Sequence, residues 1–496
     1  MYKFKIIFTV SFIFSFVNLF SQNHLNDLKY HQDYDSTLYP FIHGVASGDA
    51  SDNSVIIWTR ITPKIKMRSL SAIWEIAIDS AFTKIIKTGE YQTLPEDDYV
   101  VKIKVQGLKP ATQYFYRFKS KNIYSPIGKT KTLPAKNQHV NNYSAVFFTG
   151  SNYNAGFFNA YTVVYKKENI DAVFHMGDYF YEYENNRYGN NPKRQLKPEN
   201  ECVTLQDYRT RFSHYRMDKW LRLLHQKCCW YVEWDDHEFA NNAYNEGAEN
   251  HQPEEGNWIE RKNNALKAYN EWMPLELNKK NSVYRSFDIG KLAKFIMLDS
   301  RLSRTYQKVN ANDTSKTLLG KKQLQWMFDE ILQAQKDSVK WIFLMSQVMF
   351  AHIQIAGSPI NNDQWDGYHY ERNEILDFVD KHNVKNLIIV SGDIHSSWAN
   401  IIKTPGGITI PEFITPSVTS PSVSKPVGAL SNVFIKTLWP DVKYVDLARK
   451  GYMKIDIKQD KIKVTWQFLK TIKEPSEEIS RTRIMIYKIG QKFKKE

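Results

Sequence analysis

Cysteine is scarce in this sequence, which has three among its 496 residues. Such a low count excludes a fold held together by disulfide bonds. The three, Cys202, Cys228 and Cys229, form no Cys-x-x-Cys or Cys/His pattern, so a structural zinc site is excluded as well. With 42% hydrophobic and 14% aromatic residues, the chain can bury a large core, which excludes a disordered, collagenous or coiled-coil protein.

Long apolar runs are also rare. One extends from Ile6 to Phe20, after Lys3 and Lys5 and before Ser21. It is shorter than the ~20 residues that span a bilayer. We therefore predict a signal peptide at 1–21 rather than a permanent anchor, and an exported protein of the periplasm, the extracellular space or the cell surface of a bacterium. No later segment is long and apolar enough to span, so no transmembrane segment is expected in the mature chain.

Clustered positive charge is lacking too, although 67 Lys and Arg against 53 Asp and Glu give a net charge of +14. The lysines are spread along the sequence, and the nearest approach to a run is Lys492, Lys494 and Lys495. These lie in the last segment, 471–496, which we expect to be a basic tail. A solvated lysine-rich surface accounts for the charge. Without a basic helix or an aromatic–basic motif, no nucleic-acid partner is expected.

A chain of this length is expected to form two or three domains, and its first part, 39–133, has an all-β pattern. Leu108 and Pro110 precede an alternating strand that begins at Tyr114, the pattern of the tyrosine corner in a β-sandwich. Short strands at this spacing predict a sandwich of the fibronectin III or immunoglobulin type. The strands are predicted at 55–58, 73–78, 100–105 and 114–118.

From 140 to 470, short apolar runs alternate with helical stretches, which is the pattern of an α/β domain. Strands are predicted at 145–148, 172–176, 230–232, 295–298, 341–345 and 387–390, with two more within 451–469. Helices are predicted from a cap at Thr204 toward His225, and at 258–272, 319–336 and 370–382.

Polar side chains follow most of these predicted strands. They are Ser151 after the first, Asp178 and Tyr181 after the second, Asp235, Asp236 and His237 after the third, Asp299 and Arg301 after the fourth, and Asp393 and His395 after the last. Ligands of open α/β sheets bind at the carboxyl ends of the strands. Singly, a Gly-Asp pair is usually a turn, and Asp299 with Arg301 fits a structural ion pair. The ordered set favours one shared site.

The residue types indicate the chemistry of that site. Asp, Tyr and His are hard or borderline donors that suit Ca²⁺, Mn²⁺, Fe or Zn²⁺. Carboxylates that converge on one point raise each other's pKa values unless a cation lies among them. Paired metals clamp the attacking and leaving oxygens of phosphate-ester hydrolysis. The sequence therefore predicts a metal-dependent hydrolase.

The same motifs resemble the alkaline phosphatase D (PhoD-like) family of secreted metallophosphoesterases over nearly the whole mature chain. The motifs that carry the resemblance are His43 to Asp49 with Val55 to Arg60, His175 to Tyr183, Thr204 to Arg209, Trp234 to Glu238 with Asn241 and Asn242, Leu298 to Arg301, Trp365 to Tyr368, and Ser391 to Trp398. The resemblance implies a four-layer α/β metallophosphoesterase core that holds iron and calcium.

The resemblance also implies roles for single residues. Asp178 would bridge metals and Tyr181 would bind iron. Asp236, Asp393 and His395 would complete the set of metal ligands. His237 would face the substrate and stabilise the phosphoryl oxygens or protonate the leaving group. Arg301 is expected to help orient the phosphate.

The first block of the family departs from its usual pattern here. The family reads Ser-Cys-Gln, with the cysteine as an iron ligand, whereas this chain reads Gly150-Ser151-Asn152 and is one residue shorter. Ser151 then takes the place of the thiolate, and a neutral hydroxyl is a far poorer ligand for Fe³⁺. Another metal, the loss of one metal, or another oxygen ligand from the loop are the open alternatives.

The expected function is therefore hydrolysis of phosphate esters, small or polymeric, by in-line attack of a metal-bound hydroxide, in a protein that acts as a monomer. Two alternatives stay open. The chain could be a surface-binding protein with a vestigial metallophosphoesterase site, or it could hydrolyse another ester, such as a sulfate ester.

Overall fold

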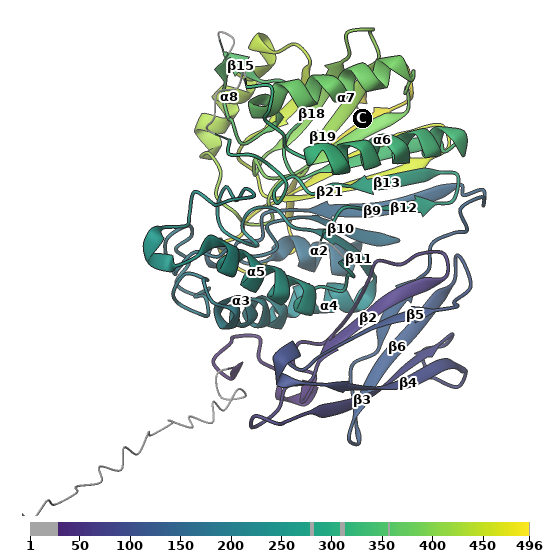
Figure 1. Ribbon diagram of the computed structural model, residues 1–496, viewed down its shortest axis with the longest axis vertical. Coiled ribbons are helices and arrows are strands. Elements are labelled where there is room, and N and C mark those ends of the chain that lie inside the picture. The colour runs from purple at the N-terminus through teal and green to yellow at the C-terminus, as the bar shows by residue number, and fades with distance from the viewer. Residues whose placement is uncertain (1–27, 278–281, 308–312, 356–357, 496) are drawn as a thin grey trace, which may run out of the picture.

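The computed structural model describes residues 28–277, 282–307, 313–355 and 358–495, so the predicted signal peptide at 1–21 lies outside the described residues. Two large β-sheets lie face to face in the middle of the molecule, and helices cover the outer face of each (Figure 1). This arrangement confirms the predicted four-layer α/β core. A smaller sheet built from early parts of the chain adjoins it.

The first large sheet has ten strands in the described chain, and its centre is parallel. β9, β10, β11 and β1 pair in parallel, and the outer pairs are antiparallel. In spatial order the strands are β24 (Lys494–Lys495), β23 (Ile479–Tyr487), β22 (Ile462–Leu469), β21 (Gly451–Lys458), β9 (Asn142–Phe148), β10 (Ala172–Met176), β11 (Cys229–Glu233), β1 (Val45–Gly48), β2 (Ser54–Arg60) and β5 (Val100–Gln106).

The second large sheet has seven described strands, and its parallel centre consists of β13, β14, β17 and β19. In spatial order they are β12 (Arg285–Ile289), β13 (Ala293–Met297), β14 (Trp341–Ser346), β17 (Leu387–Ser391), β19 (Thr409–Ile414), β18 (Ser397–Lys403) and β20 (Val442–Asp446). A separate short pair consists of β15 (Gln354–Ile355) and β16 (Ser358–Pro359).

Helices cover the outer faces of the two sheets (Figure 1). The first sheet carries α2 (Asn159–Lys167), α3 (Leu205–Met217), α4 (Lys219–Lys227) and α5 (Trp258–Trp272). The second carries α6 (Gly320–Lys336) and α7 (His369–Lys381), with α8 (Lys425–Leu438) beside β20. Thr204 caps α3 as predicted, because its side chain accepts a hydrogen bond from the Asp207 N–H while Asp207 bonds back to the Thr204 N–H.

Aromatic side chains fill the space between the two sheets. The ring of Phe174 from β10 stacks on Phe295 from β13 with 4.6 Å between centroids, and Phe295 stacks on Phe343 from β14 at 4.8 Å. Every residue of β10 and β13 is buried, since these strands have covered faces on both sides. This double coverage explains why both strands are mostly apolar, with His175 the one polar residue of β10 and Lys294 the one polar residue of β13.

The all-β character of the first part is confirmed, and so is its tyrosine corner: the hydroxyl of Tyr114 accepts a hydrogen bond of 2.8 Å from the Lys109 N–H. One layer of the sandwich is a separate sheet of β4 (Ile85–Thr93), β3 (Leu70–Ala77), β6 (Gln113–Ser120) and β7 (Ile123–Tyr124), with β8 (Gly128–Lys131) paired to β6. The opposite layer, β1, β2 and β5, belongs to the ten-stranded sheet. The sandwich and the α/β core therefore share a sheet.

The last segment, 471–496, is more than the tail that its basic residues indicated. β23 pairs with β22 from Ile462↔Tyr487 to Leu469↔Ile479, and its Met485 is fully buried. Met485 and Tyr487 are buried while Ile484 and Ile486 between and beside them are only half-buried, because one face of the strand meets the core. Its two arginines, Arg481 and Arg483, lie in the less buried first half of the strand, and Arg483 packs over the ring of Tyr444.

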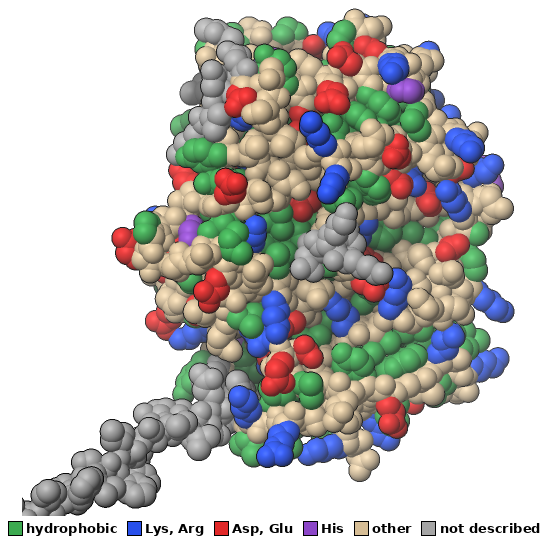
Figure 2. Space-filling model, in the orientation of Figure 1, with side chains coloured by type: hydrophobic (Ala, Val, Ile, Leu, Met, Phe, Trp, Pro, Cys, Tyr) green, Lys and Arg blue, Asp and Glu red, His purple; other side chains and the backbone are tan. Residues whose placement is uncertain are grey.

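The surface agrees with the dispersed charge of the sequence. On the face seen in Figure 2, lysine and arginine side chains are interspersed with acidic ones rather than gathered over one element. None of the helices in the described part of the chain has both the length and the apolar character that crossing a bilayer requires.

Candidate metal centre

The candidate site lies where β10, β11 and β17 end. Asp178 follows β10 with a φ of 55°, and Asp393 follows β17 with a φ of 59°. Gly177 precedes Asp178 with a φ of 90°, and a Cβ placed on it would lie 2.4 Å from the backbone nitrogen of Asp235. Only glycine allows the two loops to approach this closely. The predicted Gly-Asp turns therefore bring carboxylates from neighbouring strands together.

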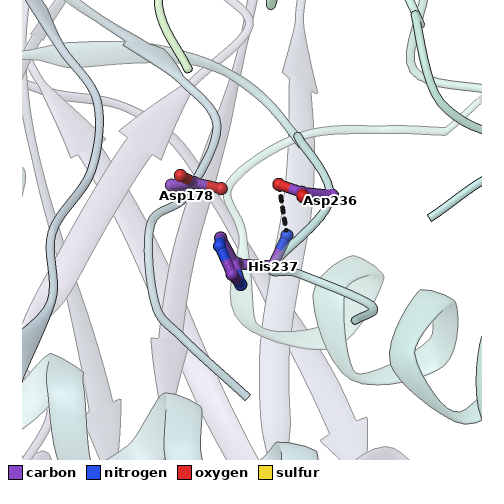
Figure 3. Close-up of side chains that lie close together, drawn as sticks. All are labelled: Asp178, Asp236 and His237. Carbon is purple, nitrogen blue, oxygen red and sulfur yellow. Dashed lines mark hydrogen bonds between the residues drawn. The ribbon is translucent and has the colours of Figure 1, made fainter. Parts of the chain in front are cut away.

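Asp178, Asp236 and His237 converge in this place (Figure 3). One ligand atom from each residue lies within 4.8 Å of the others, and all three side chains are buried. Asp236 accepts a hydrogen bond from its neighbour's backbone, His237 N–H, at 3.0 Å, and another from the Asn242 N–H at 2.6 Å. Asp178 keeps its Oδ1 atom buried without a partner among the described residues.

Glu238 holds the two loops in register, a role the sequence did not reveal. Its carboxylate accepts hydrogen bonds from the backbone N–H groups of Asp178 at 3.0 Å, Tyr179 at 2.7 Å and Asp235 at 2.8 Å. The side chain is fully buried. Because these bonds join the end of β10 to the end of β11, Glu238 fixes the separation of Asp178 and Asp236.

Glu182 orients His237. A carboxylate oxygen of Glu182 lies 2.7 Å from Nδ1 of His237, and the other oxygen accepts bonds from the Asn241 N–H and the Asn250 side chain. Burial disfavours a charged imidazole, but the carboxylates of Asp236 and Glu182 outweigh it and raise the pKa of His237 to about 10. The imidazole of His237 is therefore held in place through Nδ1, and its surroundings favour the protonated ring.

A second group of donors adjoins Asp178. The hydroxyl of Tyr181 donates a 2.8 Å hydrogen bond to Oδ2 of Asp178 and lies 2.8 Å from Nε2 of His395. The same His395 nitrogen is 3.3 Å from Oδ2 of Asp178. Burial, helped by Lys450, lowers the pKa of His395 to about 3, so its ring is neutral and able to act as a ligand.

The electrostatics of the site favour a cation beside Asp178. Burial raises the pKa of Asp178 well above its usual range, and the Asp236 charge adds to this. Burial acts on Asp236 in the same way, but the charges of Arg301 and His237 outweigh it and lower the pKa of Asp236 below its usual range. A cation would stabilise the ionised Asp178 and would supply the partner that its Oδ1 atom lacks.

Arg301 compensates the remaining carboxylates. Its Nε donates to Asp235, its Nη1 to Asp363 at 2.9 Å and its Nη2 to Asp393 at 2.8 Å. The side chain is fully buried. Asp235, Asp236 and Asp393 also lie close enough together to hold an ion, but Arg301 already places a positive charge among them. A metal is therefore better placed beside Asp178 and Asp236, which His237 adjoins.

Ser151 uses its hydroxyl in another direction. The hydroxyl lies 2.6 Å from the hydroxyl of Tyr161 and 3.3 Å from Nε2 of His175. The side-chain direction that leads toward the second donor group belongs to Gly150, where an added Cβ would lie 3.0 Å from Cδ2 of His395 and 3.2 Å from Oγ of Ser420. The residue of this loop whose side chain would point toward His395 is therefore Gly150, which has no side chain.

Each predicted site residue can now be placed. The structure brings together Asp178, Tyr181, Asp236, His237 and His395, with Arg301 and Asp393 beside them. Glu182 and Glu238 lie within the sequence motifs, but their roles were not predicted, and neither were Asp363 and Ser420 as residues of the site. Ser420 follows β19, and the polar residues after that apolar run were a signal that could have revealed it.

Carboxylates, a phenol and imidazoles meet at the carboxyl ends of these parallel strands. This arrangement defines a class of α/β proteins built around a metal-dependent hydrolytic site. Comparison with known proteins makes the assignment specific. The family model for the PhoD-like phosphatase matches residues 145–466, and the model for the N-terminal domain of that family matches residues 28–134. The chain belongs to the PhoD-like phosphatase family.

Two relatives agree with this assignment. Alkaline phosphatase D of Bacillus subtilis (strain 168) is 34% identical over 483 residues, which cover 91% of this chain and 82% of that protein. The solved structure of PhoD superimposes with a TM-score of 0.86 at 32% identity and covers 93% of both chains. The family makes this chain an alkaline phosphatase D-like phosphoester hydrolase.

Proposed function

We propose that the protein is an exported, metal-dependent hydrolase of phosphate monoesters or diesters. The observation that carries the proposal is the buried group of Asp178, Asp236 and His237, with the unpartnered Oδ1 of Asp178. Carboxylate, phenol and imidazole donors fit a hard or borderline cation such as Ca²⁺, Mn²⁺, Zn²⁺ or iron. Asp178 and Asp236 would hold it, with Tyr181 and His395 as further ligand candidates. When bound, such a metal polarises phosphoryl oxygens and lowers the pKa of water.

Protein side chains supply the other parts of the proposed mechanism. Glu182 holds Nδ1 of His237, so Nε2 is the nitrogen that faces an ester and donates a proton to the leaving oxygen. The N–H groups of Arg301 are occupied by Asp235, Asp363 and Asp393, so we assign it the positioning of these carboxylates rather than direct contact with phosphate. Both oxygens of Asp393 are likewise engaged, by Arg301 and by Gln364.

The contacts of Ser151 bear on which metal the site holds. Ser151 spends its hydroxyl on Tyr161 and His175, so we do not assign it as a ligand. The loop therefore offers no thiolate, and calcium with iron, which the family resemblance implies, requires iron held by oxygen and nitrogen donors alone. Elemental analysis of protein purified without chelators or a metal-binding tag tests this. If the analysis finds calcium, zinc or manganese without iron, the protein does not use the calcium and iron pair.

The decisive experiment compares the wild-type protein with Asp178→Asn. We expect the variant to lose at least a hundredfold in kcat with p-nitrophenyl phosphate and bis(p-nitrophenyl) phosphate, and to lose bound metal. A matched control is Asp171→Asn, which removes a carboxylate outside the site, paired with Lys131. Full activity and full metal content in Asp178→Asn would contradict the proposal. If the wild-type protein hydrolyses p-nitrophenyl sulfate but neither phosphate ester, its substrates are sulfate esters instead.

Export and oligomeric state belong to the same proposal. Residues 1–21 would direct export and be removed, so the amino terminus of the protein recovered outside the cytoplasm should begin near Ser21. We propose a monomer, which light scattering of the purified protein tests. Retention of residues 1–21 on membranes would argue for an anchor instead.

A further inference from the structure

The outer face of α8 carries large apolar side chains that face solvent. Val433 and Phe434 are 65% and 60% exposed. Val427 and Leu438 lie on the same outer face and are 54% and 47% exposed. The inner side of the helix packs on the protein through Ile435, beside β20, so that α8 lies at the margin of the molecule (Figure 1). Single exposed apolar residues are ordinary, but four on one helix face mark an interaction surface.

A basic pocket adjoins this apolar face. It has a volume of about 350 Å³ and lies between α8, β20 and β23. Five cationic side chains line it, which are those of Lys436, Lys443, Arg449, Arg481 and Arg483. Lys436 follows Val433 by three residues on α8, and residues at this spacing are neighbours on a helix surface. The apolar face and the basic pocket therefore form one continuous surface.

The positive charge of the basic pocket is not neutralised within the described chain. Arg449 pairs with Asp446, the one acidic residue of the lining. Among the described residues, no carboxylate pairs with Lys436, Arg481 or Arg483.

Arg483 has the least satisfied cation of the pocket. Its guanidinium lies 5.4 Å from the ring centroid of Tyr444, and its Nε atom is buried without a hydrogen-bond partner in the described chain. Withdrawing a charged donor from water is unfavourable unless a partner compensates it. An anion beside this guanidinium would supply the missing charge.

The combination of the two features indicates what covers this surface. Helices that lie on membranes place an apolar face among the acyl chains and cationic side chains against the phosphates of anionic lipids. A second copy of the chain fits less well. A symmetric contact brings the same surface of both subunits together, so that two basic pockets would lie close to each other.

We propose that α8 docks the protein onto a membrane surface that contains anionic phospholipids, with lipid headgroups at the basic pocket. The docking helix is joined directly to a loop of the metal centre. It begins five residues after Ser420, whose hydroxyl donates to the hydroxyl of Tyr181. Docking itself requires no hydrolysis, so the inference and the proposed function can fail separately.

The test uses lipid vesicles and the mature chain, because the apolar run from Ile6 to Phe20 would bind lipid by itself. Flotation is measured with phosphatidylcholine vesicles and with vesicles that also contain phosphatidylglycerol. We expect firm binding to the mixed vesicles and weak binding to phosphatidylcholine alone. Binding to the mixed vesicles should decrease as the salt concentration rises, because salt screens the cations.

One pair of substitutions tests the apolar face. Val433→Ser with Phe434→Ser should weaken binding to the mixed vesicles about tenfold or more, because it removes apolar area that would enter the membrane. Ile85→Ser with Ile86→Ser is the matched control. Both isoleucines lie on β4 and are 43% exposed, and their replacement should leave binding unchanged.

A second pair tests the basic pocket. Lys436→Gln with Arg481→Gln removes two cations and keeps the apolar face, so binding to the mixed vesicles should fall to the level seen with phosphatidylcholine. Lys84→Gln with Lys129→Gln, two exposed lysines of the sandwich, is the charge-matched control and should bind like the wild-type protein. Circular dichroism verifies that each variant is folded.

Three results would overturn the inference. The first is equal binding to both kinds of vesicle, or binding to neither. The second is binding to mixed vesicles that both pairs of substitutions leave unchanged. The third is a dimer in light scattering that Val433→Ser with Phe434→Ser dissociates, which would assign the apolar face to a second copy of the chain. Docking without any hydrolysis of p-nitrophenyl phosphate or bis(p-nitrophenyl) phosphate would instead contradict the proposed function and leave the docking surface intact.

Discussion

At the scale of single residues, the Glu182 carboxylate determines how His237 works, because its oxygen lies 2.7 Å from Nδ1 of the ring. We predict that Glu182→Gln lowers kcat by about 10–100-fold, the usual cost of removing a carboxylate that orients a histidine. The amide keeps the bond but loses the charge that supports a protonated ring. Steady-state kinetics over a range of pH measure the loss. The limb of the pH–rate profile that reports the ionisation of His237 should also shift to lower pH, which a purely structural defect would not cause.

Glu184→Gln is the matched control for this prediction. Glu184 lies in the same loop and its partner is Arg187, at the surface. The control should keep both kcat and the pH profile of the wild-type protein. A Glu182→Gln protein with an unshifted profile and full activity would show that His237 needs no orienting carboxylate.

Ser151 offers a second prediction at this scale. Because its hydroxyl bonds to Tyr161 and His175, Ser151→Ala should lower the free energy of unfolding by about 1 kcal/mol and leave the metal content unchanged. Ser151→Cys should place a protonated thiol in the same buried position and recruit no iron. Chemical denaturation and elemental analysis measure both effects. Iron with a visible thiolate absorption band in Ser151→Cys would contradict the assignment.

The residues of the site differ in how far the sequence predicts them. Asp178, Asp236 and His395 follow apolar strands, and parallel strands carry their ends to one edge, so position alone indicates convergence. The partners of Arg301 could not be predicted this way. Asp363 lies 62 residues away in a segment between β16 and α7, and only the tertiary fold brings it within 2.9 Å. Ser151 shows a different limit, since an aligned position does not fix where a side chain points.

At the scale of elements, strand existence was easier to predict than strand partners. β10 was predicted with its observed bounds, as was α5, because each has a pronounced apolar pattern and clear ends. The apolar residues of β2 and β5 also indicated strands, but they held no information about which sheet the strands join. β23 was missed for a related reason: its polar first half and the lysines after it resemble a solvated tail, and the local sequence holds no information about its pairing with β22.

Removing β23 is the prediction at this scale. A chain that ends at Lys470 exposes the edge of β22 and the part of the core that Met485 and Tyr487 cover, and it loses the burial of these two side chains, which contributes about 3–6 kcal/mol together. We expect much lower soluble yield and an earlier thermal transition. A chain that ends at Phe493 removes Lys494 and Lys495 but keeps β23, and it should unfold like the full protein. Equal stability of the two truncated chains would contradict this role for β23.

At the scale of the whole molecule, the shared sheet joins the two architectures. β1 pairs in parallel with β11, and Gly48 of β1 is so close to Pro274 that a Cβ would lie 2.1 Å from the Pro274 oxygen. Across the same junction, the indole of Trp58 donates to the Glu271 oxygen at 2.7 Å, and Arg285 pairs with Asp49 at 2.7 Å. One apolar cluster runs from the sandwich into the space between the large sheets. The N-terminal part therefore contributes to the stability of the layer that carries Asp236 and His237.

This continuity predicts a single cooperative unfolding transition for residues 28–496, because neither part can lose its core without exposing the other. Differential scanning calorimetry measures it, and the calorimetric and van't Hoff enthalpies should agree. Expressed alone, residues 28–134 would leave β1 without β11 and expose the inner edge of the sheet, so we expect a poorly folded, aggregating fragment. Two resolved transitions, or a separate fragment that melts sharply, would show that the junction is a docking interface between independent domains. In that case, changes at Asp49 or Trp58 should leave the metal centre untouched, whereas a common core requires that they lower its thermal stability as well.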